Sequence, residues 1–134
     1  MIRKLALIAA IGAATVPILA YAQHRTIDLH DYDDELMRDL DKTIKYFEPD
    51  ISAQNAQGAL DDAAVLQDGF KYTLDYFSKK GGADDAVQIS KEGQSQIAAA
   101  IKSVSENNFE AAAEAARAVA KTCRACHDIY KTPK

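Results

Sequence analysis

Two cysteines and a histidine near the C-terminus carry the most distinctive chemistry of this sequence, in the run Cys123-Arg124-Ala125-Cys126-His127. The pattern C-x-x-C-H is typical of c-type haem attachment, in which two thiols add across the haem vinyl groups and an imidazole binds the iron. On a helix, residues at positions i, i+3 and i+4 lie on one face. The spacing therefore predicts a covalently bound haem on one side of a single helical turn.

Two other kinds of site share part of this pattern. A C-x-x-C pair also occurs in thioredoxin-like proteins, beside a strand of a βαβ unit, but no segment here alternates like a strand. The pair could also supply half of a zinc site, yet the chain has no further cysteine and only two further histidines, His24 and His30. Haem is favoured because a histidine directly follows the second cysteine and because the chain begins with a segment typical of export.

Residues 1–22 have the parts of a secretory signal peptide. A basic start, with Arg3 and Lys4, precedes an apolar stretch that ends in the small-residue cleavage site Ala20-Tyr21-Ala22. We predict cleavage between Ala22 and Gln23, which would release the mature chain into the periplasm; an uncleaved membrane anchor is the alternative. Export agrees with the haem motif, since c-type haem is attached outside the bacterial cytoplasm, in a compartment where free cysteines would otherwise oxidise.

The mature chain, residues 23–134, has the length of one small domain. Of 16 basic and 20 acidic residues in the whole sequence, Arg3 and Lys4 are lost with the signal peptide, which leaves 14 basic residues and a formal charge of −6. An acidic surface of this kind argues against nucleic acid as a partner.

Four amphipathic stretches without a strand pattern predict an all-α domain. The first begins at a cap formed by Thr26 or Asp28 and ends at Pro49, and the other three cover about 52–80, 84–104 and 109–131. The stops between them are Gly81-Gly82 and the Asn107-Asn108 pair. Because short connections make successive long helices antiparallel, we predict an up-down-up-down four-helix bundle with covalently bound haem.

Apolar residues at three- and four-residue steps identify the expected core face of the first three helices. They are Leu29, Tyr32, Leu36, Leu40, Ile44 and Phe47, then Ala56, Leu60, Ala63, Phe70, Leu74 and Phe77, then Ala86, Ile89, Gly93, Ile97, Ile101 and Val104. The last helix is instead rich in alanine, the best helix former. Small side chains would also leave room for a flat cofactor between helices, and the two explanations are compatible.

A four-helix bundle with C-x-x-C-H on its last helix resembles the class II cytochromes c, the cytochrome c′ family. The resemblance covers the mature chain and is strongest over residues 119–131, which are similar to the family's terminal motif C-K-x-C-H-x-x-Y-R. It implies one haem c per chain, Cys123 and Cys126 as the thioether attachments and His127 as the proximal iron ligand. Lys131 stands where the family often has arginine, so stacking of a guanidinium on the imidazole is not expected here.

The resemblance also bears on the second axial ligand. Low-spin members of the family have a methionine in the first helix, in a pattern like Y-R-Q-x-x-M-K. This chain keeps the tyrosine, the methionine and the basic residue as Tyr32, Met37 and Arg38, but has Asp33 where the family has an arginine that faces a haem propionate. Met37 is accordingly the expected distal ligand. There are two alternatives: Met37 fills a gap in the core and does not bind the iron, or His30 is the distal ligand.

These observations lead to three hypotheses about function. The first is a periplasmic one-electron carrier with a His/Met-ligated haem, whose partners are other redox proteins of the periplasm or membrane. The second is a five-coordinate cytochrome c′ that binds nitric oxide or carbon monoxide, and the third is a helical bundle without haem. The sequence has no signature of an enzyme. Family members often pair through their first two helices, so the resemblance allows a homodimer.

Overall fold

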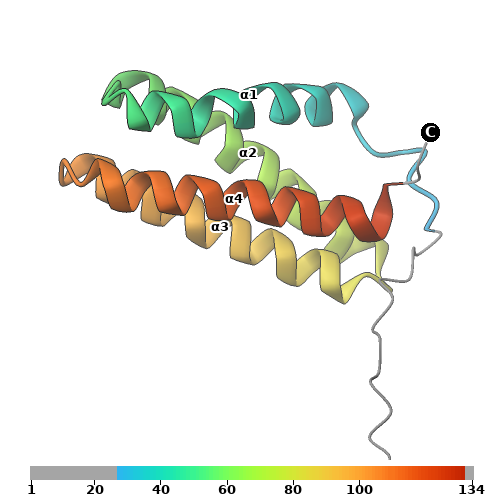
Figure 1. Ribbon diagram of the computed structural model, residues 1–134. Coiled ribbons are helices and arrows are strands. Elements are labelled where there is room, and N and C mark those ends of the chain that lie inside the picture. Colours follow the sequence, from blue (N-terminus) through green and yellow to red (C-terminus); the bar gives the residue numbers. More distant parts are fainter. Residues whose placement is uncertain (1–26, 132–134) are drawn as a thin grey trace, which may run out of the picture.

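Four helices follow one another along the chain in the computed structural model, which describes residues 27–131 (Figure 1). They are α1 (Asp34–Ser52), α2 (Ala56–Lys80), α3 (Asp84–Ser105) and α4 (Phe109–Tyr130). Each helix contacts the next one in sequence, and α1 contacts α4, which closes the bundle. The prediction of an all-α four-helix bundle with short connections is confirmed.

The helix ends follow from capping residues in the sequence. Asn55 and Asn108 each accept a hydrogen bond from the backbone N–H three residues later, at the starts of α2 and α4. Gly81 ends α2 with a φ of 74°, in the left-handed region that costs glycine nothing, and its N–H donates to the Phe77 carbonyl. The predicted stops at Gly81-Gly82 and Asn107-Asn108 are therefore confirmed.

The prediction for the start of the first helix was wrong. The helix begins at Asp34 because the carboxylate of Asp33 accepts hydrogen bonds from the N–H groups of Glu35 and Leu36, at 3.0 and 2.9 Å. Residues 27–33, which we call the strap, precede this cap and are not helical. Leu29, His30 and Tyr32 therefore lie on the strap instead of on the first helix.

The prediction that Pro49 ends this helix was also wrong, because α1 continues to Ser52. A proline lacks only its own N–H, and its carbonyl still accepts from the N–H of Ala53 at 2.9 Å. Gln54, with a φ of 59°, then turns the chain, so α2 begins at Ala56 and not at Ser52.

The core draws side chains from all four helices. The largest fully buried ones are Phe47, Ile51, Leu66, Ile97 and Val119. The alanines of α4 mostly serve this packing: Ala112, Ala113, Ala115 and Ala116 are buried in the core, where small side chains let helices approach closely. Leu60, expected in the core stripe of α2, is instead exposed.

Gly93 of α3 packs directly against Phe70 of α2, since a side chain at position 93 would collide with the Phe70 ring. Overpacking of this kind costs about 1–3 kcal/mol, and the better helix propensity of alanine recovers about 1 kcal/mol. We therefore expect Gly93→Ala to lower the free energy of unfolding by up to about 2 kcal/mol in urea denaturation. Ser95→Ala, on the exposed side of α3, is the control and should change it by less than about 0.5 kcal/mol. Equal midpoints for the two variants would contradict the expected clash.

Several sequence predictions lie outside residues 27–131 and therefore outside the described structure. These are the signal peptide of residues 1–22 with its cleavage site, and the residues His24 and Thr26. Among the helices that are described, none has both the length and the apolar character needed to cross a membrane.

Candidate functional site

Two neighbouring cavities each have a volume of about 210 Å³: the first lies among all four helices, and the second among the strap, α1, α2 and α4. Four residues line both of them: Met37, Thr73, Cys126 and His127. The first cavity has a mainly apolar wall that includes Leu40, Ile44, Phe70, Ile89, Ala120 and Cys123. The second is walled by the strap and by aromatic rings, with Leu29, Tyr32, Phe77 and Tyr130. Three of the four predicted site residues are thus common to the two cavities, and Cys123 lines the first.

The haem motif lies on the last turns of α4, as its spacing predicts. Cys123, Cys126 and His127 are half-buried, whereas Arg124 and Ala125 between them are exposed. Both thiols are free. One face of a single helical turn therefore presents two thiols and an imidazole to the cavities.

Burial raises the pKa of both cysteine thiols, Cys123 and Cys126, to about 11. Both thiols are therefore protonated at neutral pH. A thioredoxin-like dithiol has the opposite property, a cysteine pKa lowered to give a reactive thiolate. The environment of these cysteines does not favour a dithiol redox centre.

Burial and the nearby charge of Lys131 lower the pKa of His127 below its usual value. The imidazole is therefore neutral at physiological pH, which is the form that binds a metal. Within residues 27–131, no group of three or more histidine, cysteine or acidic side chains is arranged to hold a metal ion. A protein-only metal site such as a zinc centre finds no support there.

Met37 and His30, the two sequence candidates for the distal ligand, lie in different surroundings. Met37 is half-buried in α1, outside the buried core, and lines both cavities. The side chain of His30 is 77% exposed, hydrogen-bonds to Asp28 at 2.7 Å and lines neither cavity. The structure therefore brings Met37 to the cavities that His127 lines, and it does not bring His30 there.

A polar pair on the cavity wall was missed by the sequence analysis. The hydroxyl of Thr73 donates to the carbonyl of Gly69 at 2.8 Å, so the Tyr32 hydroxyl, 2.7 Å away, must be the donor to Thr73. Burial raises the pKa of Tyr32 to about 12, which keeps this phenol protonated. Thr73 follows Phe70 by three residues and precedes Phe77 by four. The helical period of α2 could therefore have indicated that Thr73 lies on the same face as these two rings.

Asp33, the main departure from the family pattern, has a structural role of its own. As the N-cap of α1, its carboxylate satisfies two backbone N–H groups. Cationic side chains reach the cavities from α4 and its end instead: Arg124 lines the first cavity and Lys131 the second.

The residues around the two cavities fit a covalently bound haem. Free thiols and an imidazole share one helical turn, a thioether sulfur lines the same two cavities, and most of the remaining wall is apolar. This donor set matches His/Met ligation of a c-type haem. Comparison with known proteins adds no family: no family model, no curated protein and no solved structure matches this chain.

Proposed function

We propose that this protein is a periplasmic c-type cytochrome of the cytochrome c′ type and carries one electron at a time on a His/Met-ligated haem. The observation that supports it most is the shared wall of the two cavities, where Met37 of α1 and Cys126 and His127 of α4 meet. These two helices are far apart in the sequence. Their packing brings Met37 to the cavities that the histidine of the C-x-x-C-H motif also lines, which supports the proposed pair of ligands.

Each of these residues has a separate role in the proposal. Cys123 and Cys126 hold the haem through thioethers, and His127 and Met37 bind the iron from α4 and α1. When bound, the haem supplies a one-electron couple. The protein holds both ligands on packed helices and surrounds them with apolar side chains, which limits water access and thereby tunes the reduction potential.

The partners of an electron carrier would be other redox proteins of the periplasm or membrane. Lys121 and Arg124 are exposed next to the attachment motif and would favour an acidic partner there. A homodimer through α1 and α2 stays a prediction. Exposed apolar side chains on these two helices are compatible with it: Tyr46, Leu60, Val65 and Tyr72.

A visible spectrum of the protein, expressed together with haem-maturation machinery, tests this proposal directly. We expect a c-type haem spectrum that is low-spin in the oxidised state and changes little when carbon monoxide is added, since Met37 would occupy the sixth position. A high-spin spectrum with immediate carbon monoxide binding would favour the five-coordinate gas-binding protein. Colourless protein would leave only the bundle without haem.

A further inference from the structure

The strap, residues 27–33, forms one wall of the second cavity. Its apolar side chains, those of Ile27, Leu29 and Tyr32, pack on a cluster that includes Phe77 and Tyr130, and Leu29 and Tyr32 line the cavity itself. Because the strap is not helical, its backbone lacks the hydrogen-bond ladder that fixes α1 directly after it. Side-chain contacts must therefore hold it in place.

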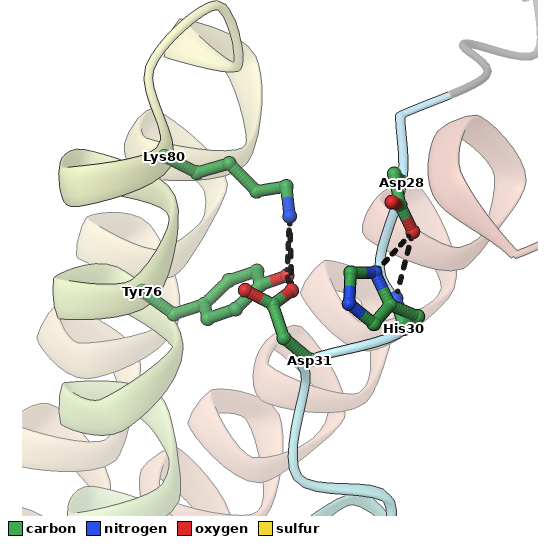
Figure 2. Close-up of polar contacts among 5 residues, drawn as sticks. All are labelled: Asp28, His30, Asp31, Tyr76 and Lys80. Atoms are coloured by element: carbon green, nitrogen blue, oxygen red, sulfur yellow. Dashed lines mark hydrogen bonds and ion pairs between the residues drawn. The ribbon is translucent and has the colours of Figure 1, made fainter.

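A three-residue cluster joins the strap to α2 (Figure 2). One carboxylate oxygen of Asp31 accepts hydrogen bonds from the Tyr76 hydroxyl at 2.6 Å and from the Lys80 ammonium at 2.9 Å. Lys80 also donates to the Tyr76 hydroxyl at 3.0 Å, so each member of the cluster contacts the other two. The Lys80 side chain is only 22% exposed, although that of Asp31 is 56% exposed.

The hydrogen bonds from Tyr76 and Lys80 lower the pKa of Asp31 to about 2. Asp31 is therefore fully ionised at neutral pH, and its bonds to Tyr76 and Lys80 are charge-assisted. Closed networks with more than two members hold a surface segment better than a single exposed ion pair does.

Asp31 directly precedes Tyr32, and the Tyr32 side chain contacts the same region of α2. The Tyr32 ring lies edge-on to Tyr76, with 4.9 Å between ring centroids, and its hydroxyl donates to Thr73. Release of Asp31 would leave the strap attached mainly by the apolar contacts of Ile27, Leu29 and Tyr32. The second cavity would then open more often to solvent.

We propose that Asp31 is a positioning residue of the haem site: bound by Tyr76 and Lys80, it holds the strap across the second cavity and so limits access of small ligands to the iron from that side. This inference rests on the proposed haem function for the identity of the group in the cavity. Asp31 itself lines neither cavity. It acts through Leu29 and Tyr32, which do line the second.

Asp28 offers a matched control on the same segment. Its carboxylate accepts hydrogen bonds from the backbone and the ring of His30, both within the strap, and Figure 2 shows this pair apart from the Asp31 cluster. Asp28→Ala and Asp31→Ala therefore remove the same charge from the strap. Only Asp31→Ala removes bonds to α2.

The first measurement is chymotrypsin cleavage of the full mature haem protein, with mass spectrometry to identify cuts after Leu29 and Tyr32. We expect Asp31→Ala to be cut there several-fold faster than the wild type and Asp28→Ala at the wild-type rate. Asp31→Glu should be cut at close to the wild-type rate, because its carboxylate can still reach Lys80.

The second measurement is carbon monoxide association after flash photolysis, with Met37→Ala in every variant so that the iron is open. Asp31→Ala should speed association several-fold and Asp28→Ala should not.

Equal cleavage of the two alanine variants would overturn the role of Asp31. Faster cleavage of Asp31→Ala without faster carbon monoxide association would overturn it too, because the strap would then be a structural element without influence on the haem site. Failure of the proposed function looks different, since the wild-type protein itself would then contain no covalent haem.

Discussion

Replacement of both Cys123 and Cys126 with alanine is expected to remove essentially all haem that resists acid-acetone extraction. In the wild type, two thioethers would hold the haem through denaturation, so the extracted protein should keep its colour. Without the thiols, any haem in the cavities would be held only by ligation and apolar contact, and denaturation in the solvent would release it. The measurement is haem absorbance of the precipitated protein, normalised to protein content.

Three further variants separate the attachment chemistry from disturbance of α4. Lys121 is exposed on α4 two residues before Cys123 and lines neither cavity, so Lys121→Ala should keep its haem fully. Each single cysteine variant should keep haem through the remaining thioether. Extraction-resistant haem in the double variant would overturn the assignment of both residues.

Loss of the haem should also affect the fold, because both cysteines pack at the edges of the apolar clusters. Cys123 packs against the main core and Cys126 against the cluster of Phe77 and Tyr130. A small domain of this length has a limited core of its own, and a covalently held apolar group would extend it. The double variant is therefore expected to unfold at a lower urea concentration than Lys121→Ala.

The haem motif could be predicted from the sequence because its geometry is local. A helix places residues at i, i+3 and i+4 on one face whatever surrounds it, so the common orientation of Cys123, Cys126 and His127 needed no tertiary information. The bundle was predictable for a similar reason. Long apolar periods and short connections leave few arrangements other than antiparallel neighbours.

The start of α1 could not be predicted, because three residues were able to cap it. Thr26, Asp28 and Asp33 are all suitable N-caps, and Leu29 and Tyr32 continue the apolar period of the helix backwards. Two residues before the actual cap, Asp31 bonds to Tyr76 and Lys80 of α2, which are 45 and 49 residues away in the sequence. Contacts of that separation are not visible in a local pattern.

The surroundings of the site were predicted only in part from the sequence. Periodicity identified Phe70 and Phe77 but passed over Thr73 between them, because a polar residue does not register in an apolar stripe. It also placed Leu60 in the core although that side chain is exposed, since a heptad-like stripe does not reveal how wide the buried face is. The meeting of Met37 with His127 at one pair of cavities depends on how α1 packs against α4.

Met37→Ala is expected to convert the oxidised protein from low spin to high spin and to open the iron to carbon monoxide. Met37 is the only methionine of the predicted mature chain, and it lines the two cavities that His127 also lines. A thioether is a neutral, soft ligand that favours ferrous iron, and a permanently filled sixth position suits electron transfer better than ligand binding. In the wild type, carbon monoxide could bind only in the fraction of molecules whose Met37 is detached. If that fraction is about 1%, the variant would bind carbon monoxide roughly 100-fold more tightly.

Met37→Leu distinguishes ligation from packing, because leucine has nearly the volume of methionine but no sulfur. If Met37 binds the iron, the leucine and alanine variants should both be high-spin, and both should lose the near-infrared band of sulfur-ligated ferric haem. If Met37 only fills space, Met37→Leu should keep the wild-type spectrum while Met37→Ala alone changes it. The third outcome, a wild-type protein that is already high-spin and binds carbon monoxide at once, would refute distal ligation by Met37 and favour the gas-binding function over electron transfer.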